Sequence, residues 1–345
     1  TEQRRAIEAN MLKLRHHDFV LQLRHTFRLA RGDSDSRRVL MVEIEHDGLV
    51  GRGEAAPIAR YGQDAASAAR AAEVMAARID NPLAFESAAA RAAVAGQPAA
   101  EAAIDMALRD LAGKRLGVPL YEMLGIDPRT MPVTSFTIGM DTPEIVEQKV
   151  REAEGFAVLK VKMGSEDDAT VLETVRRATD RPVRIDANEG WSLDDALGRL
   201  EWLQEMGVEF VEQPLPAGQL AEMRELKKRS PLPLIADESV GRAKDIPRLA
   251  DAFDGINIKL MKCGGLGEAL RMIHVARAHN MQVMLGCMVE SSLAVTAAAH
   301  IAPLVDYADL DGNLLITNDP FIGAEVRDGK LVLPSEPGLG VRDRS

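Results

Sequence analysis

Hydrophobic and polar positions change their period along the chain. Residues 11–29 and 38–54 alternate as strands do, and the second stretch turns back at His46-Asp47-Gly48, which predicts an antiparallel opening. A polar loop is expected between the two stretches, from Leu29 to Arg37. From residue 64 to 125 the pattern becomes alanine-rich and helical. The first part of the chain is therefore predicted to be an α+β unit.

After residue 131 short apolar strands alternate with helical segments at a regular spacing. The polar residues near successive strand ends lie 26, 26, 25, 22, 28 and 24 residues apart: Lys160, Asp186, Glu212, Asp237, Lys259, Cys287 and Asp311. Such a period fits one strand, one helix and two short loops. The predicted strands are 133–138, 158–162, 183–186, 209–212, 234–237, 256–260, 283–286 and 307–310. This α/β pattern predicts a TIM-type barrel, with an open doubly wound sheet as the alternative.

The pattern divides the chain into three parts. Residues 1–128 are predicted to form an N-terminal α+β capping domain, and residues 129–313 a (β/α)7β barrel that carries the active site. The last helix is missing from the pattern, and two short strands follow at 325–326 and 330–333. We expect this C-terminal segment, 314–345, to return to the capping domain.

Composition excludes several classes of partner and site. The formal net charge of −11 argues against a general nucleic-acid or anionic-membrane surface. The two cysteines, Cys263 and Cys287, are far apart and follow no CxxC spacing, so neither a disulfide framework nor a zinc site is indicated. The chain has no run of eighteen apolar residues and no signal-peptide pattern at its start. We therefore expect a protein of the cytoplasm.

Two lysines stand at alternate positions of one predicted strand. Side chains alternate in a strand, so Lys160 and Lys162 share a face, while Leu159 and Val161 share the other. Like charge and partial desolvation both disfavour protonation, so we expect a lowered pKa for at least one of the two lysines. A neutral lysine at this position could take a proton from carbon.

Three consecutive strand ends carry one carboxylate each: Asp186, Glu212 and Asp237. In a barrel such ends converge at one mouth, where three carboxylates would repel one another without a cation. Ligands that are all oxygen suit a hard ion, which favours Mg²⁺ first and Mn²⁺ second. The sequence therefore predicts one metal site per subunit.

A third lysine, Lys259, ends a later strand across the predicted barrel from Lys160 and Lys162. A metal between opposed lysines could hold a carboxylate, stabilise the charge that forms when its α-proton leaves, and expose the α-carbon to a base on either face. This arrangement indicates racemisation or epimerisation. Lys262 lies three positions after Lys259, so strand alternation would turn its side chain to the opposite face, and we interpret it as a loop charge.

With these features together, the chain resembles the enolase superfamily, in the muconate-lactonising subgroup with its Lys-x-Lys motif. The resemblance covers nearly the whole chain. It implies that Lys162 and Lys259 are the two catalytic bases, and that Lys160 lowers the pKa of its neighbour and binds the substrate carboxylate. It also implies that Asp186, Glu212 and Asp237 bind the metal.

Within the subgroup, the pair Asp309 and Asp311 at the eighth strand end resembles the Asp-x-Asp of dipeptide epimerases. Their spacing turns both carboxylates to one face, where they could bind a free α-ammonium. The resemblance also implies a substrate-binding role for Thr137 and for residues 287–289, which are Cys287, Met288 and Val289. The expected partner is a small dipeptide, in a homo-oligomeric enzyme.

The preferred dipeptide is predicted from Arg31, in the loop where related glutamate-selective enzymes carry an arginine. Arg31 favours an L-Ala-D/L-Glu substrate such as a murein peptide. Asp33 and Asp35 in the same segment would instead favour a dipeptide with a cationic side chain. A hydrophobic dipeptide is a further alternative. Other enzymes of the subgroup are cycloisomerases, o-succinylbenzoate synthases and N-acylamino acid racemases. Their substrates lack an ammonium for Asp309 and Asp311. A non-catalytic sugar-acid or peptide-binding protein is the alternative from another class.

Overall fold

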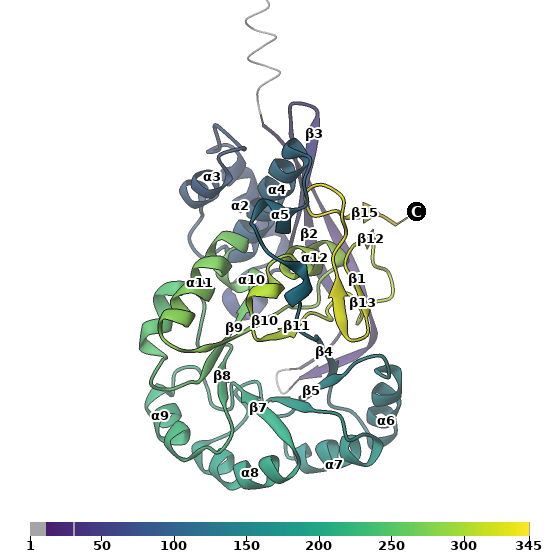
Figure 1. Ribbon diagram of the computed structural model, residues 1–345, viewed down its shortest axis with the longest axis vertical. Helices are drawn as coiled ribbons and strands as arrows, with labels where there is room; N and C mark the ends of the chain where they lie inside the picture. The colour runs from purple at the N-terminus through teal and green to yellow at the C-terminus, as the bar shows by residue number, and fades with distance from the viewer. Residues whose placement is uncertain (1–11, 30–31, 345) are drawn as a thin grey trace, which may run out of the picture.

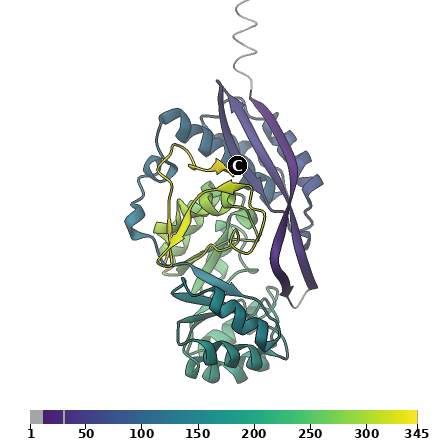
Figure 2. The ribbon, with the colours of Figure 1, turned by 90° about the vertical axis from the view of Figure 1, so that its right-hand side faces the viewer.

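The computed structural model describes residues 12–29 and 32–344 of the chain. The N-terminal part forms a capping domain of three antiparallel strands, β1 (Lys13–Leu29), β2 (Gly32–His46) and β3 (Leu49–Ala55). Its helices are α2 (Ala65–Ala76), α3 (Phe85–Ala92), α4 (Pro98–Leu116) and α5 (Leu120–Met123), with the short 3-10 helices η1 (Ala59–Tyr61) and η2 (Pro128–Thr130). Figure 2 shows the strands along one side of the molecule, with the long β1–β2 ribbon reaching towards the barrel.

The polar loop predicted between the first two strands is wrong over most of its length. Strand β2 begins at Gly32, so residues 32–37 pair with β1. The register shifts between Gln22 and Phe27, and this irregularity lets the ribbon continue beyond the capping sheet. Of the polar side chains in this segment, Asp35 is exposed, whereas Ser34, Ser36 and Arg37 are half-buried.

Helix α4 is the centre of the capping domain and packs against β3 through small residues. A side chain at Gly53 would place its Cβ 1.9 Å from the Ala103 carbonyl oxygen, and Gly51 approaches Ala107 in the same way. Both faces of the helix are buried, because α4 also contacts α10 (Leu260–Cys263) and α11 (Leu266–Ala278) of the barrel. The alanine-rich pattern therefore reflects close backbone packing on both sides.

The second part is an eight-stranded parallel barrel, as predicted. Its strands, in order around the sheet, are β4 (Ser135–Ile138), β5 (Val158–Lys162), β6 (Val183–Asp186), β7 (Val208–Glu212), β8 (Leu234–Ala236), β9 (Gly255–Lys259), β10 (Gln282–Gly286) and β11 (Tyr307–Asp309). A parallel bridge between Thr134 and Ala308 joins the first strand to the last. The predicted strands 158–162 and 183–186 match β5 and β6, and the other six differ from the observed strands by one or two residues at their ends.

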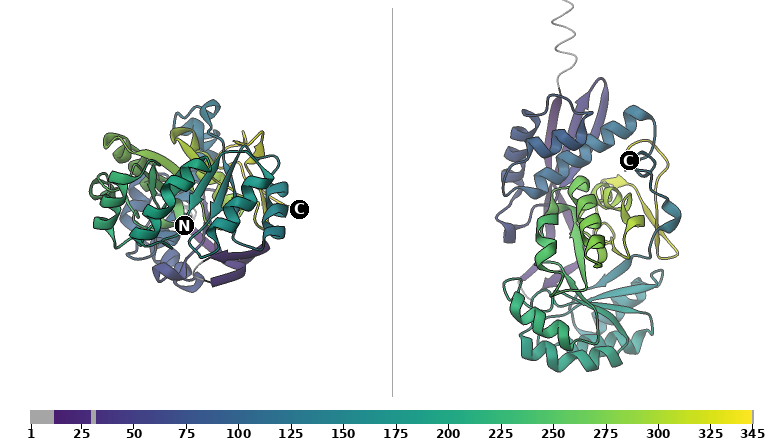
Figure 3. Two further views of the ribbon diagram at one scale, coloured as in Figure 1. Left: turned by 90° about the horizontal axis from the view of Figure 1, so that it is seen from below. Right: turned by 60° about the vertical axis from the view of Figure 1, so that its left-hand side comes forward.

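Helices cover the outside of the barrel (Figures 1 and 3). They are α6 (Pro143–Glu152), α7 (Asp168–Ala178), α8 (Leu193–Glu205), α9 (Leu220–Arg229), the 3-10 helix η3 (Ala243–Arg248), α10 (Leu260–Cys263), α11 (Leu266–Ala278), α12 (Ser292–Ala299) and η4 (Ala302–Leu304). A 3-10 helix thus connects β8 to β9, where the other long connections are α-helical. No helix in the described part of the chain is long and apolar enough to cross a membrane.

The C-terminal segment joins the two parts. It contains β12 (Phe321–Ile322), β13 (Glu325–Arg327), β14 (Lys330–Val332) and β15 (Arg342–Asp343). Ile316 bridges to Leu23 of β1, and the Asp343 carboxylate lies 2.9 Å from Arg52 of β3. His300 is buried at this junction, where Nδ1 accepts from the Tyr121 N–H and Nε2 donates to the Leu339 carbonyl, both at 3.2 Å.

Burial lowers the pKa of His300 from 6.5 to about 4, which predicts acid sensitivity. The unfolded chain binds a proton at His300 below about pH 6.5, whereas the folded protein does not until about pH 4. Stability is therefore expected to fall by up to roughly 3 kcal/mol as the pH drops through this window. Thermal unfolding of His300→Gln should lose that part of the pH dependence. The same change at His274, exposed on α11, should leave it intact, and an unchanged slope in His300→Gln would contradict the assignment.

Candidate active site

The charged strand ends of the barrel meet at its carboxyl-terminal mouth. Parallel pairing sets Lys162 of β5 beside Asp186 of β6, and Asp186 beside Glu212 of β7. Asp237 directly follows β8, and Lys259 ends β9. Strands β5 and β9 are four apart in an eight-stranded barrel, so they face each other. The three carboxylates therefore lie between the two lysines of β5 and the lysine of β9.

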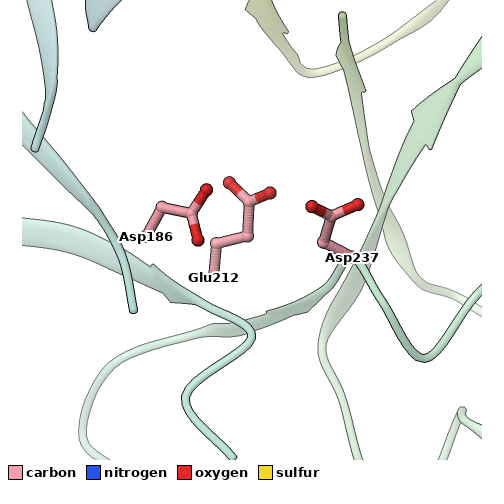
Figure 4. Close-up of side chains that lie close together, drawn as sticks. All are labelled: Asp186, Glu212 and Asp237. Atoms are coloured by element: carbon pink, nitrogen blue, oxygen red, sulfur yellow. The ribbon is translucent and has the colours of Figure 1, made fainter. Parts of the chain in front are cut away.

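The carboxylates of Asp186, Glu212 and Asp237 form a compact buried group (Figure 4). One oxygen of each lies within 4.8 Å of the others, close enough to share one metal ion. Three carboxylate donors fit a hard divalent cation such as Mg²⁺. The structure thus brings the three predicted metal ligands together.

Lysine ammoniums contact each of these carboxylates. Lys160 Nζ lies 3.0 Å from Asp186 and 2.7 Å from Glu212, and Lys162 Nζ lies 2.7 Å from Asp186. Lys259 Nζ lies 2.8 Å from Asp237. The argument that the carboxylates would lack a counter-charge without a cation is therefore wrong, and the metal prediction rests on their geometry.

The expected lowering of a lysine pKa is also wrong for Lys160. Burial disfavours its charged form, but Asp186, Asp309 and Glu212 outweigh burial and hold the pKa of Lys160 well above its usual value. Asp237 likewise outweighs burial and raises the pKa of Lys259. A cation bound at the carboxylates would neutralise the charges that hold these pKa values high, and could also bind a substrate carboxylate.

Two buried side chains next to the carboxylates, those of Lys262 and Asn257, do not follow from the strand pattern. Lys262 is buried and contacts the Asp237 carboxylate and, at 2.6 Å, its carbonyl oxygen. The prediction that Lys262 is a loop charge is wrong, because helix α10 begins at Leu260, so strand alternation stops at Lys259 and the Lys262 side chain turns inward. Asn257 of β9 donates to Glu212 at 2.7 Å, and occupies the space where a side chain at Gly286 would lie.

A cavity of about 610 Å³ lies between the barrel mouth and the capping domain. This is within the range of roughly 300–1,000 Å³ that is typical of small-molecule sites. The lysines predicted to be catalytic, Lys160, Lys162 and Lys259, line it, and so do the predicted substrate-binding residues Thr137, Cys287, Met288, Val289, Asp309 and Asp311. Arg31 lies outside the described residues, so its predicted role stays a prediction.

The two carboxylates of the Asp-x-Asp pair have different partners. Asp309 contacts Lys160 at 2.8 Å and accepts from the Ser135 hydroxyl at 2.6 Å. Burial opposes its charge, but Lys160 and Ser135 hold the pKa of Asp309 below its usual value. Asp311 accepts from the Thr137 N–H at 2.6 Å, and burial together with Asp309 raises the pKa of Asp311 to about 7. Asp311 is therefore the member of the pair that would gain most from a cationic ligand.

The capping domain is held over the mouth by charged contacts. Arg60 of η1 reaches Glu189 in the loop after β6, with Nη1 and Oε2 2.5 Å apart. Glu54 at the end of β3 is buried and accepts from the Ser291 N–H at 3.0 Å and from the Ser291 hydroxyl. Ser291 follows the loop 287–289, so these contacts fix both walls of the cavity.

Comparison with known proteins agrees with this architecture. Residues 14–125 match the family described as mandelate racemase / muconate lactonizing enzyme, N-terminal domain, and residues 144–343 match the enolase C-terminal domain-like family. An L-Ala-D/L-Glu epimerase of Bacteroides thetaiotaomicron is 43% identical over 96% of this chain and 88% of its own length. A hydrophobic dipeptide epimerase of Roseobacter litoralis is 38% identical over 95% and 98%.

A solved structure is similar over the whole chain. The dipeptide epimerase from Cytophaga hutchinsonii, complexed with Mg and the dipeptide D-Ala-L-Val, superposes with a TM-score of 0.91 at 27% identity, and covers 97% of this chain and 96% of that one. The two family matches span both the capping domain and the barrel. The chain therefore belongs to the enolase superfamily, in its mandelate racemase / muconate-lactonising group.

Proposed function

We propose that this protein is a metal-dependent dipeptide epimerase that inverts the α-carbon of the second residue. The observation that carries the proposal is the placement of Lys162 and Lys259 on facing strands, with three buried carboxylates between them. One lysine would remove the α-proton and the other would return a proton to the opposite face. The similar proteins named as dipeptide epimerases support this assignment.

In this proposal the remaining residues bind and orient the dipeptide. Lys160 holds the substrate carboxylate, and Asp311, with Asp309 beside it, binds the free α-ammonium. Thr137 and residues 287–289 form the walls along the peptide. An N-acylated substrate has no ammonium and would leave the buried Asp311 without a cationic partner, which disfavours N-acylamino acid racemisation.

We assign one Mg²⁺ per chain to Asp186, Glu212 and Asp237, with Mn²⁺ as a substitute. Once bound, the ion would supply charge stabilisation for the enediolate formed when the α-proton leaves. We further assign the enzyme to the cytoplasm, because Cys263 and Cys287 are both free. Assembly as a homo-oligomer is also part of the proposal, and sedimentation analysis would test it.

Proton exchange in D₂O tests the function directly. L-Ala-L-Glu, L-Ala-L-Leu and L-Ala-L-Lys are incubated with the protein and Mg²⁺ in D₂O, and proton NMR follows the α-proton of the second residue. An epimerase exchanges that proton for deuterium and forms the second epimer. Binding of a dipeptide without exchange would instead support the non-catalytic alternative. The glutamyl peptide, as in murein peptides, is our first choice of substrate, and hydrophobic and cationic peptides are the alternatives.

Asp311→Asn should weaken binding of the ammonium without affecting the metal. The loss of one charge-assisted contact predicts a rise in KM for free dipeptides of about 10- to 100-fold. N-acetylated dipeptides should be poor substrates of the unaltered enzyme for the same reason. The matched control is Asp306→Asn, since Asp306 lies at the other end of β11 and contacts Arg277 at 2.6 Å. Equal turnover of free and acetylated peptides would exclude this role.

A further inference from the structure

Three arginines of the capping domain line the cavity opposite the barrel: Arg37, Arg38 and Arg60. Arg38 contacts Asp18 and Arg60 contacts Glu189, whereas Arg37 has no such ion pair among the described side chains. Arg37 lies on β2 and lines the cavity. Its neighbours Ser34 and Ser36 line the same wall. Arg37 is half-buried, so its charge is partly removed from water.

The guanidinium of Arg37 has few partners. Nη1 donates to the Ser36 carbonyl at a long 3.4 Å, and within the described chain no carboxylate lies at ion-pair distance. The other buried or half-buried arginines of the described residues each contact a carboxylate or several carbonyl oxygens: Arg52, Arg109, Arg176, Arg181, Arg184, Arg199, Arg224 and Arg242. Arg37 therefore differs from the arginines that have a structural role.

Two carboxylates of the capping domain, one on β2 and one that lines the cavity, already have other partners. Asp35 accepts from the Thr26 hydroxyl at 2.6 Å, and Asp64 caps α2 by accepting from the Ser67 N–H at 2.6 Å. Burial alone lowers the pKa of Arg37 from its ordinary value, as expected of a guanidinium without an anionic neighbour. Such a group gains more than a solvated arginine does when a carboxylate ligand reaches it.

The charges of a bound dipeptide can be assigned in turn. In the proposed function, the ammonium lies at Asp311 and the α-carboxylate lies among the lysines and metal ligands. The side chain of the second residue then remains, and the capping domain forms the remaining wall. A neutral side chain there would leave Arg37 partly desolvated and unpaired, whereas a carboxylate would satisfy its donors.

We propose that Arg37 determines specificity by binding the side-chain carboxylate of an acidic second residue. The inference rests on the proposed function, because it takes the positions of the other two charges from it. It assigns the glutamyl carboxylate to a residue on strand β2, in addition to or in place of Arg31. Arg37 acts in substrate binding and takes no part in proton transfer.

The test compares L-Ala-L-Glu with L-Ala-L-Gln, which has the same shape and lacks the charge. Arg37→Gln should lower kcat/KM for the glutamyl peptide by about 30-fold or more and change the glutaminyl peptide by less than about threefold. Arg37→Lys should restore part of the loss, since it keeps the charge without the bidentate fork. The matched control is Arg15→Gln, because Arg15 of β1 is exposed, contacts Glu45 at 3.0 Å and is not among the residues that line the cavity. Activity on the glutaminyl peptide also reports that each variant is folded.

The outcomes separate the inference from the proposed function. Absence of α-proton exchange with every dipeptide would overturn both. Epimerisation with no preference for the glutamyl over the glutaminyl peptide would overturn the Arg37 assignment and leave the epimerase intact. A preference that survives Arg37→Gln but is lost in Arg31→Met would transfer the role to Arg31 and likewise overturn the assignment. An equal loss in Arg15→Gln would show a general charge effect and overturn it too.

Discussion

Lys162→Ala and Lys259→Ala are each expected to abolish epimerisation. Each variant should still exchange the α-proton of one of the two substrate epimers. Each variant keeps one base, so it should exchange the α-proton of one substrate epimer with D₂O and fail to form the other epimer. The loss in epimerisation should be about 10²- to 10⁴-fold, as is usual for a general acid or base. The two variants should act on opposite epimers, because their lysines lie on facing strands, β5 and β9.

Contacts around the two lysines make this experiment interpretable. Asp186 keeps Lys160 at 3.0 Å when Lys162 is removed, and Asp237 keeps Lys262 when Lys259 is removed. Neither variant therefore leaves a buried carboxylate without a lysine, and both should fold. The control is Lys227→Ala, whose lysine contacts Asp254 at 3.3 Å and is not among the residues that line the cavity. Interconversion of both epimers at near the original rate by either variant would refute the two-base assignment.

Much of the barrel could be predicted because its constraints are local. Strands buried on both faces read as short apolar runs, and the regular interval between their polar ends reflects one strand and one helix per repeat. Asp186, Glu212, Asp237 and Lys259 all stand at such ends, so the period alone places them at one mouth. The convergence of these residues follows from topology, and topology could be predicted from the spacing.

The electrostatic state of the site could not be predicted from one strand. Lys160 and Lys162 share a face as expected, but the pKa of Lys160 depends on three carboxylates from β6, β7 and β11. Their distances from the ammonium follow from the barrel geometry, which the sequence does not give. The contact of Lys262 with Asp237 could not be predicted for a related reason, because the point where the strand ends and α10 begins decides where the Lys262 side chain points.

The capping wall was the least predictable part of the site. A polar segment with several arginines reads as a loop, yet residues 32–37 continue β2 and bring Arg37 to the cavity. Which arginine is left without an anionic partner depends on tertiary contacts such as that of Arg38 with Asp18. The specificity of such an enzyme is therefore harder to predict from sequence than its chemistry.

Removal of the metal is expected to abolish activity, and Glu212→Gln to weaken metal binding. Chelation should stop both epimerisation and α-proton exchange, and Mg²⁺ or Mn²⁺ should restore them. In Glu212→Gln the amide oxygen can still accept from Asn257, which donates to Glu212 at 2.7 Å, so the side chain should keep its place. The amide, however, lacks the negative charge of the carboxylate and offers only one oxygen.

Calorimetric titration of the metal-free protein with Mg²⁺ measures this effect without using activity. Glu212→Gln should lower the affinity for Mg²⁺ by at least about 100-fold. Changes to residues that only contact a metal ligand lower metal affinity by up to about 100-fold, and Glu212 is itself a proposed ligand. The matched control is Glu209→Gln, since Glu209 lies three residues earlier on β7, is exposed and contacts Arg184 at 2.9 Å. This control should bind Mg²⁺ normally, because its carboxylate lies at the other end of the strand. Full activity in a metal-free preparation would exclude the metal role, since the four lysines would then be the whole counter-charge of the carboxylates.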